Sequence, residues 1–420
     1  MSILENRIGY GMLLCAILAT ACTSTANKNT EPMKSTLSKG FYGFDVDFFV
    51  KNKISTIELK DSLTGAAVLL VPAYQGRVMT STADGNEGNS FGWINYKFIE
   101  AGKQSAQFNP FGGEERLWLG PEGGPFSIYF EKGKEQTFAN WVVPKAIDTE
   151  GFDIVEQNSK SVIFKKDFEL INASGTTMQI GIQRKVSLLS RDEAEKALNL
   201  KLGDSLSFVA YESQNTLINR GTSDWNNKTG VLSIWMLAMF NPSEQGVVFI
   251  PFKRGDEAQL GKKVSDDYFG KVPSERLIVK DDVLFFKTDG KFRSKIGISP
   301  QRALPSCGSY DPQKKVLTLL WYSSPEKPSS YVNSKWGKQD DALKGDVVNS
   351  YNDGPVDDGS IMGPFYEIES SSPAAMLAAG AQISHTQRIF HISGEESQLN
   401  EICLQLFNIQ ISTIKQVFNF

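Results

Sequence analysis

One short segment of the sequence gathers side chains that could bind or act on a carbohydrate. Residues 108–124, with the sequence FNPFGGEERLWLGPEGG, hold three carboxylates, one guanidinium and an indole between two glycine pairs. An indole can stack on the C–H face of a sugar, and charged groups can bind its hydroxyl groups through strong hydrogen bonds. A glycine-rich hairpin with a core tryptophan and a surface ion pair would have the same composition. The candidates for sugar contact are Glu115, Arg116, Trp118 and Glu122.

A second acidic group lies late in the chain. Glu367 and Glu369 are two residues apart in the segment FYEIESSSP, so on a strand they lie on the same face. Their like charges would raise each other's pKa, which suits acid and base work. Carboxylates on both sides of a sugar also serve glycosidic bond cleavage, with Glu114, Glu115 or Glu122 as the partner acid. The alternative is that both late glutamates are solvent-facing strand residues.

Two charged turns complete the set of candidates. Residues 287–295 place four basic side chains around a turn, which could hold a sugar carboxylate or sulfate or form a solvated hairpin. Residues 351–359, YNDGPVDDG, offer three aspartates just before the late glutamates, with Asp353 as the candidate ligand contact. Hard oxygen ligands of this kind suit Ca²⁺, although the spacing fits no EF-hand. A loop that contacts the ligand is the preferred interpretation, and no cofactor is required.

Several familiar chemistries are excluded by residue type. The chain has only two histidines, His385 and His391, which excludes a multi-histidine metal centre. It contains no glycine-rich phosphate loop, no Cys-x-x-Cys pair and no nucleophile elbow. The two histidines are expected to be structural or surface residues. Cys307 and Cys403 could form a disulfide or remain as two buried thiols.

The elements that must position these residues are predicted to be strands, because turn clusters recur at short intervals. The apolar runs between the turns lie at 67–71, 161–164, 178–182, 283–286 and 316–322. Helices are expected at 191–199 and 396–406. No linker interrupts the body, so the sequence predicts a single all-β domain over residues 41–420, a sandwich of large antiparallel sheets with a few short helices.

The N-terminus has the pattern of a lipoprotein signal peptide. Arg7 precedes the apolar run 12–18, and three small residues precede Cys22. The run is too short to span a bilayer, which needs about 20 apolar residues. We therefore expect a signal peptide at 1–21, lipidation of Cys22 and a flexible tether at 22–40. An ordinary secretory signal with an incidental cysteine is the alternative.

Composition and charge narrow the functional classes further. Of the 420 residues, 40% are hydrophobic and 22% charged, as in ordinary globular proteins. With 44 basic and 48 acidic residues the net charge is −4. The sequence therefore shows no excess of basic residues of the kind that binds nucleic acid. We expect a cell-envelope protein that contacts the membrane through its lipid anchor only, at the outer membrane and facing the periplasm.

The order of several motifs resembles the galactose mutarotase-like (aldose 1-epimerase-like) superfamily, in a branch of secreted lipoproteins. The motifs are Gly76-Arg-Val78, the segment 111–122, residues 215–219 with Trp225 and 232–235, and residues 365–373 with 379–386. The similarity spans roughly residues 55–395, and it depends on order and spacing more than on any single motif. It implies a β-supersandwich with a sugar site on one concave sheet face, in agreement with the strands above.

The resemblance also implies roles for individual residues. In sugar mutarotases a histidine pair and an arginine bind and protonate the ring oxygen, while a late glutamate takes the proton of the anomeric hydroxyl. Arg77 matches the arginine, and Glu367 or Glu369 the glutamate, but no histidine precedes residue 385. The catalytic candidates are therefore Glu367, Glu369 and Glu122. The substrate-binding candidates are Arg77, Glu115, Arg116, Trp118 and Asp353. All of them except Asp353 should line one concave surface together with the three catalytic candidates, with Trp118 partly open.

Three kinds of function remain open. The protein could be an enzyme that acts on carbohydrate as an epimerase, hydrolase or lyase. It could be a carbohydrate-binding lipoprotein without catalysis, or a structural lipoprotein that uses the scaffold for protein contact. Fold cannot choose among them, because function depends on the site. The density of Glu, Arg and Trp favours a carbohydrate-active or carbohydrate-binding envelope protein.

Overall fold

The computed structural model describes residues 37–327, 329–356 and 358–418. From Leu37 onward these residues form one compact unit. The predicted signal peptide, the lipidation site Cys22 and most of the predicted tether lie outside the described residues. Within the described ranges, no helix reaches the length and apolar character that a membrane span requires.

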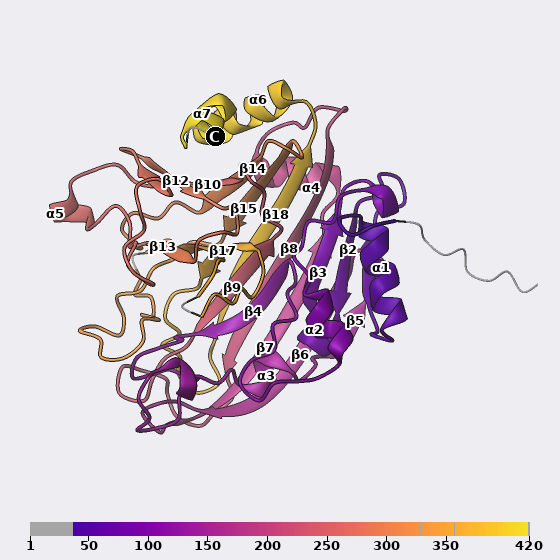
Figure 1. Ribbon diagram of the computed structural model, residues 1–420. Helices are drawn as coiled ribbons and strands as arrows, with labels where there is room; N and C mark the ends of the chain where they lie inside the picture. The colour runs from indigo at the N-terminus through magenta and orange to yellow at the C-terminus, as the bar shows by residue number, and fades with distance from the viewer. Residues whose placement is uncertain (1–36, 328, 357, 419–420) are drawn as a thin grey trace, which may run out of the picture. The chain divides into compact units, whose positions relative to one another are not determined.

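Two antiparallel sheets make up most of the described chain (Figure 1). The first has eight strands in the order β1-β2-β3-β4-β9-β17-β16-β13. Their bounds are β1 Ile57–Lys60, β2 Ala67–Val71, β3 Arg77–Thr82, β4 Glu115–Gly120, β9 Ser233–Phe240, β13 Ser294–Ile298, β16 Val348–Asn352 and β17 Tyr366–Ser371. Neighbouring strands run antiparallel, which confirms the all-β prediction.

The second sheet has ten strands in the order β11-β12-β10-β14-β15-β18-β8-β7-β6-β5, and its neighbours are also antiparallel. Their bounds are β5 Asp153–Gln157, β6 Ser161–Ile171, β7 Thr177–Leu188, β8 Ser207–Asn219, β10 Val247–Pro251, β11 Leu277–Val279, β12 Val283–Lys287, β14 Ser306–Asp311, β15 Val316–Tyr322 and β18 Gln382–Ser393.

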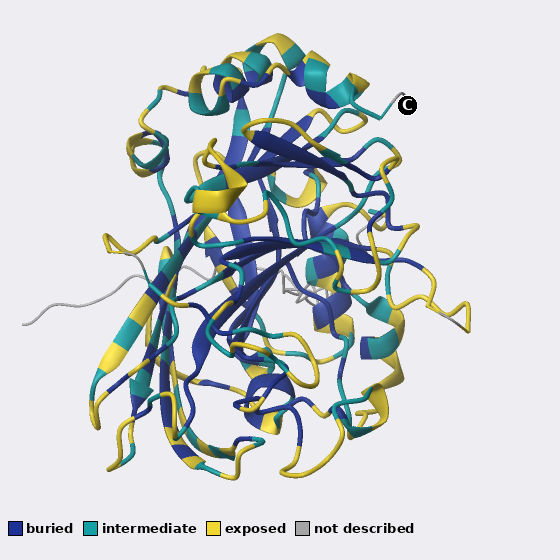
Figure 2. Cartoon of the chain, turned by 90° about the vertical axis from the view of Figure 1, so that its left-hand side faces the viewer, coloured by how far each residue is buried: buried dark blue, intermediate teal, exposed yellow. Residues whose placement is uncertain are grey.

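The main hydrophobic core lies between the two sheets. Leu117, Ile234 and Ile368 contribute to it from the eight-stranded sheet, and Phe164 and Leu320 from the ten-stranded sheet. Strands that are packed on both faces are buried along most of their length, and Figure 2 shows them mainly in dark blue, the colour of buried residues. This packing of sheet on sheet is the predicted sandwich.

Helices cover parts of the outer face of each sheet. α1 Tyr42–Lys51 and α2 Tyr96–Ala101 pack on β2 and β3. α4 Arg191–Leu198, α6 Glu396–Phe407 and α7 Ile411–Gln416 pack on the ten-stranded sheet. The short segments η1 Pro72–Tyr74, η2 Gly85–Glu87, η3 Phe138–Asn140, α3 Lys145–Asp148 and α5 Glu257–Leu260 lie in connections. Loops line the outer face of β4, β9, β17, β16 and β13, where the candidate site lies.

The predicted strands and helices agree well with these elements. All five apolar runs lie in strands β2, β6, β7, β12 and β15, and the two predicted helices are α4 and α6. A capping box of Ser190 and Glu193 begins α4. Helix α1 was not among the predictions, because its sequence YGFDVDFFVK is rich in residues of low helix propensity. Packing of Tyr42 and Phe49 against the sheet stabilises it instead.

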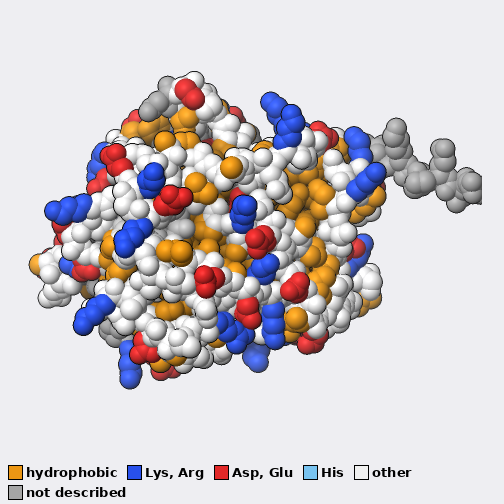
Figure 3. All heavy atoms as spheres, turned by 90° about the horizontal axis from the view of Figure 1, so that it is seen from below, with side chains coloured by type: hydrophobic (Ala, Val, Ile, Leu, Met, Phe, Trp, Pro, Cys, Tyr) orange, Lys and Arg blue, Asp and Glu red, His pale blue; other side chains and the backbone are white. Residues whose placement is uncertain are grey.

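Charged side chains are mixed on the molecular surface. Figure 3 shows basic and acidic groups interspersed with apolar side chains on the face seen from below. That distribution agrees with the small net charge of −4.

Candidate functional site

Strand β4 presents two different surfaces, because successive side chains of a strand point to opposite faces of the sheet. Leu117 and Leu119 share a face with Glu115, which contacts Arg184 of the ten-stranded sheet, so they point into the interior between the sheets. Arg116 and Trp118 therefore point to the outer face, where the Arg116 guanidinium lies over the Trp118 ring. The outer surface of β4 is the centre of the candidate site.

The glycine pairs on either side of β4 let other segments approach it closely. Gly113 has a φ of +113°, and a Cβ on it would lie 2.6 Å from Cδ of Arg77. A Cβ on Gly123 would lie 2.7 Å from Cα of Trp336. Glycine is thus required where Arg77 and the loop carrying Trp336 pack on the two ends of the strand.

The strands beside β4 place further polar side chains on the same outer face. Directly opposed residues of antiparallel strands share a face. Arg116 of β4 and Glu369 of β17 both lie opposite Leu237 of β9. Glu367 of β17 and Lys295 of β13 both lie opposite Tyr351 of β16. The sheet thereby brings together Arg116 and Glu367, which are 251 residues apart in the chain.

Two ion pairs connect these side chains. Nη2 of Arg116 lies 3.1 Å from Oε1 of Glu367, and both side chains are buried. Nζ of Lys295 lies 2.8 Å from Oε2 of Glu369, which also accepts a 2.8 Å hydrogen bond from Nε1 of Trp235. Buried charges are costly unless they are paired, so these contacts explain how the two glutamates tolerate burial.

Glu122 joins the two late glutamates from the loop that follows β4. Burial raises the pKa of Glu122, and the Lys295 ammonium opposes this shift while the Glu369 carboxylate adds to it. The indole N–H groups of Trp336 and Trp141 lie near enough to lower the pKa in part. The pKa of the Glu122 carboxyl is therefore raised, and the charges of Lys295 and Glu369 both act on it.

Glu367 is also a perturbed acid. Burial raises the pKa of Glu367 to about 7, with Arg116 opposing the shift and Glu369 adding to it. Burial disfavours the Lys295 charge, but the nearby carboxylates hold the pKa of Lys295 above its usual value. The site thus contains a carboxyl near its midpoint at neutral pH next to a carboxylate held by a cation. Such a pair can both donate and accept a proton.

Three buried polar atoms around these acids have no hydrogen-bond partner among the described residues. They are Nε of Arg116, Nε1 of Trp118 and Oε1 of Glu369. Buried polar atoms in proteins are nearly always paired. Their grouping on one surface indicates a place where hydroxyl groups of a ligand or of water complete the bonding.

Glu115, predicted as a substrate contact, lies on the opposite face of β4. Its Oε1 is 2.7 Å from Nη2 of Arg184, and both side chains are fully buried between the sheets. Its Oε2 accepts hydrogen bonds from Ser213 at 3.0 Å and Gln387 at 2.8 Å. The prediction is wrong because Glu115 and Arg116 are adjacent on a strand and cannot both reach one face.

Glu114 and the two histidines also belong to the interior between the sheets. Nε2 of His391 lies 3.1 Å from Oε1 of Glu114, and Nε2 of His385 lies 2.8 Å from Oγ of Ser370. Burial lowers the pKa of His385 to about 3. The histidines are therefore structural rather than surface residues, and Glu114 is not an acid of the outer site.

Trp118 lies on the predicted surface but is not open. It is 3% exposed, because Arg116 covers its ring at 4.2 Å and Trp235 packs against it edge-on at 5.7 Å. The expected stacking face is thus wrong. Trp118 forms the floor beneath Arg116 and presents its Nε1 to the site instead.

Arg77 supports the site from beside Arg116. Its guanidinium donates hydrogen bonds to the carbonyl of Gly112 at 2.8 Å and to Oε1 of Gln75 at 3.0 Å. Burial, together with the neighbouring Arg116 charge, lowers the pKa of Arg77 to about 9. These bonds fix the turn before β4.

Asp353 fixes the loop after β16. Its carboxylate accepts hydrogen bonds from the Tyr351 hydroxyl at 2.9 Å and the Gly363 amide at 2.7 Å. Its charge also adds to the raised pKa of Glu367. Among the described residues, no group of three or more His, Cys, Asp or Glu side chains is arranged to hold a metal ion.

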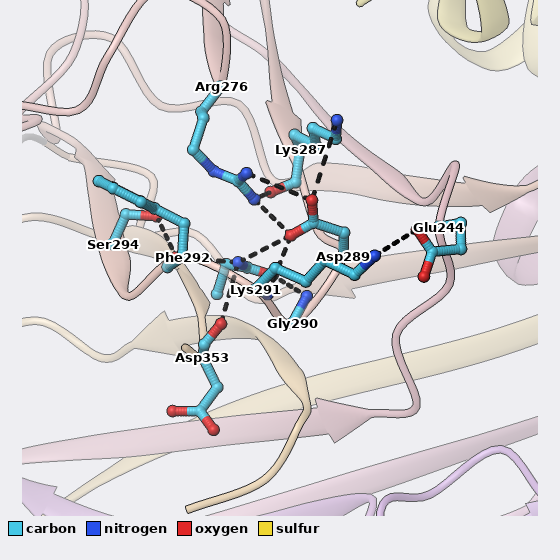
Figure 4. A network of polar contacts seen from close by, with 10 residues as sticks. Glu244, Arg276, Lys287, Asp289, Gly290, Lys291, Phe292, Ser294 and Asp353 are labelled. Carbon is cyan, nitrogen blue, oxygen red and sulfur yellow. Dashed lines mark hydrogen bonds and ion pairs between the residues drawn. The ribbon is translucent and has the colours of Figure 1, made fainter. Parts of the chain in front are cut away.

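The basic turn between β12 and β13 is held by ion pairs of its own (Figure 4). Arg276 and Lys287 point toward Asp289, at 3.2 Å and 3.8 Å. Lys291 points toward Glu244, at 2.6 Å. Lys295, at the start of β13, reaches Glu369 instead.

Three further aromatic residues of the site were not among the candidates. Trp235 was noted as part of a motif, but its bond to Glu369 depends on strand register. Trp141 and Trp336 come from loops, and their ring centroids are 6.2 Å apart. Strand alternation could have indicated Trp235, whereas no local pattern indicates where a loop tryptophan packs.

The free thiols of Cys307 and Cys403 are both buried. Burial raises the pKa of each thiol to about 12. Of the two predicted alternatives, the structure shows buried thiols.

Comparison with known proteins places the chain in a family. The chain belongs to a family of unknown function (DUF6786), which matches residues 40–418. No curated protein matches the sequence.

Similar solved structures cover most of the chain at low identity. The Slr1438 protein from Synechocystis sp. PCC 6803 is 13% identical over 81% of this chain and 96% of its own, with a TM-score of 0.48. A galactose mutarotase-like protein from Lactobacillus casei is 10% identical over 80% and 100%, with a TM-score of 0.44. A galactose mutarotase related enzyme from Lactobacillus acidophilus is 9% identical over 80% and 97%, with a TM-score of 0.43.

Proposed function

We propose that the protein binds a carbohydrate on the outer face of the eight-stranded sheet, and that Glu122, Glu367 and Glu369 exchange protons with it. The main support for this proposal is the group of buried polar atoms beside these carboxyls that have no hydrogen-bond partner among the described residues. Nε of Arg116 and Nε1 of Trp118 are donors, whereas Oε1 of Glu369 is an acceptor when ionised. A sugar hydroxyl group both donates and accepts, so one ring can satisfy donors and acceptors of this kind together.

The arrangement of the carboxyls favours one division of roles. Glu367 and Glu369 share one face of β17, so both approach a ligand from the same side. Glu122 comes from the loop after β4 and can approach from another side. Sugar epimerisation and glycosidic bond cleavage both need an acid and a base on different sides of the reacting bond. We assign the acid to Glu122, because burial raises its pKa, and the base to Glu369, which pairs with the Lys295 ammonium. The pKa of Glu367 is raised as well, so Glu367 can assist as a second acid.

Binding without catalysis is the second candidate function. Both carboxylates of β17 already pair with a cation, Glu367 with Arg116 and Glu369 with Lys295. Such pairs suit fixed hydrogen-bond acceptors as well as reacting groups. The two functions differ in whether a bound sugar is converted.

Calorimetric titration with a panel of neutral sugars tests the proposal. We expect saturable binding by the wild type, binding weakened about tenfold or more by Glu369→Gln, and unchanged binding in the control Glu169→Gln, an exposed residue of β6. If no sugar binds, or if Glu369→Gln binds as tightly as the wild type, the assignment of this site fails. Conversion of a bound sugar that is lost in Glu122→Gln with binding retained would favour the enzyme.

We also propose that the protein is anchored through a lipid on Cys22, at the outer membrane and facing the periplasm. The small residues before Cys22 and the short apolar run support this proposal. A glycan ligand of the envelope or periplasm would be within reach of such a protein.

A further inference from the structure

An exposed aromatic surface lies beside the candidate site. Phe138, Trp141 and Trp336 form it, and we call these three residues the aromatic shelf. Phe138 is 68% exposed and Trp336 36%, whereas Trp141 between them is 7% exposed. The ring planes of Phe138 and Trp336 lie within 18° and 25° of the Trp141 plane. Phe138 and Trp336 thus expose ring surface to a ligand, and Trp141 packs against both.

The shelf is continuous with the acid cluster. The indole N–H groups of Trp336 and Trp141 act on the Glu122 carboxyl. The Trp141 ring lies 6.4 Å from that of Trp118, which forms the floor beneath Arg116. Nε1 of Trp118, a side chain more than nine-tenths buried, has no hydrogen-bond partner in the described part of the chain. A ligand held by the carboxyls would therefore extend onto the shelf.

The loops that carry the shelf are fixed to each other. Oε1 of Gln136 accepts hydrogen bonds from the amides of Gly124 and Gly337, both at 2.8 Å. Nζ of Lys335 lies 3.0 Å from Asp267. The Gln136 bonds join the loop after β4 to the loop before β16, and the Lys335 ion pair joins the latter loop to the segment between β10 and β11. The rings are thus held in place before any ligand arrives, which lowers the entropic cost of binding.

We propose that the aromatic shelf is a subsite for a second sugar ring, so that the ligand is an oligosaccharide whose terminal ring lies among the carboxyls. The inference rests on the proposed function and extends it from a single sugar to a chain of sugars. Aromatic faces stack on the C–H faces of sugar rings, and the buried charges beside the shelf supply polar partners for the first ring.

Affinity as a function of chain length tests the subsite. The probes are glucose with cello- and malto-oligosaccharides of two to four rings, and galactose with β-1,4-linked galacto-oligosaccharides, each titrated into the mature protein. We expect the longer members of one series to bind about tenfold or more tighter than its monosaccharide. Phe138→Ala should remove much of this gain and leave monosaccharide affinity unchanged.

Two further variants complete the experiment. Trp336→Ala should lower oligosaccharide affinity by a larger factor than monosaccharide affinity. The control Trp321→Ala, a half-buried tryptophan of β15 in the other sheet, should change neither.

The outcomes separate the two proposals. If no sugar of any length binds the wild type, the proposed function fails and the subsite with it. If a monosaccharide binds but chain length brings no gain, or the gain survives in both Phe138→Ala and Trp336→Ala, the subsite alone is refuted. Self-association of the wild type that both shelf variants abolish, without any effect of chain length, would assign the shelf to a second copy of the chain instead.

Discussion

Removing the charge of Glu115 should strongly destabilise the protein. Glu115 is fully buried and accepts hydrogen bonds from Arg184, Ser213 and Gln387. In Glu115→Gln, an amide NH₂ replaces one acceptor oxygen and the buried Arg184 charge loses its counter-charge. Breaking a buried ion pair from one side costs about 3–5 kcal/mol. The free energy of unfolding, measured by urea denaturation, should fall by that amount.

An exposed ion pair at the ten-stranded sheet, to which Arg184 belongs, provides the control. Arg220 and Asp167 lie 3.2 Å apart with about half or more of each side chain exposed. Asp167→Asn should cost no more than about 1 kcal/mol. The combined variant Glu115→Leu with Arg184→Met removes both buried charges and should be more stable than Glu115→Gln.

Two results would refute this reasoning. A loss in Glu115→Gln no larger than in Asp167→Asn would show that the pair is not buried as described. Loss of sugar binding in Glu115→Gln with unchanged stability would indicate that Glu115 contacts the ligand. It would contradict the placement of Glu115 on the inner face of β4.

Three further predictions follow from the burial, the raised pKa and the signal pattern. Trp118→Ala should lower the free energy of unfolding by about 3–5 kcal/mol, because the ring is 3% exposed, whereas the half-open Trp336→Ala should cost much less in the same urea titration. The pKa of Glu367, raised to about 7 by burial, means that the folded state binds its proton more tightly than the unfolded state. Its contribution to stability is therefore complete below about pH 4 and is lost as the pH rises to about 7, so stability should fall more steeply over this range in the wild type than in Glu367→Gln. Cys22→Ala should move the protein from the membrane to the soluble fraction, and unchanged membrane retention would contradict the lipid anchor.

The strands of the fold could be predicted because each carries a local signal. The run Ala67–Val71 is apolar and bounded by turns, and the structure has β2 at those residues. Helix α1 has no such signal, since packing of Phe49 and its neighbours on the sheet forms it rather than intrinsic propensity.

The candidate site could be predicted only where strand alternation was applied. It places Glu367 and Glu369 together, and the same rule separates Glu115 from Arg116. Because Glu115 and Arg116 are neighbours in a segment dense in charges, the sequence suggested that both lie on one surface, whereas they lie on opposite faces of β4. Lys295 and Trp336 depend on pairings between distant segments, and no periodicity of the chain encodes those.

The two faces of β4 have a consequence for how the sequence can change in length. One residue gained or lost between Gly113 and Gly120 would rotate every later side chain of the strand to the other face. Arg116 would then enter the interior beside Arg184, and the space beneath the carboxyls would receive a leucine. Substitutions in this strand can be tested one face at a time, but insertions and deletions affect interior and site together. Length variation should therefore be absent from the six residues of β4.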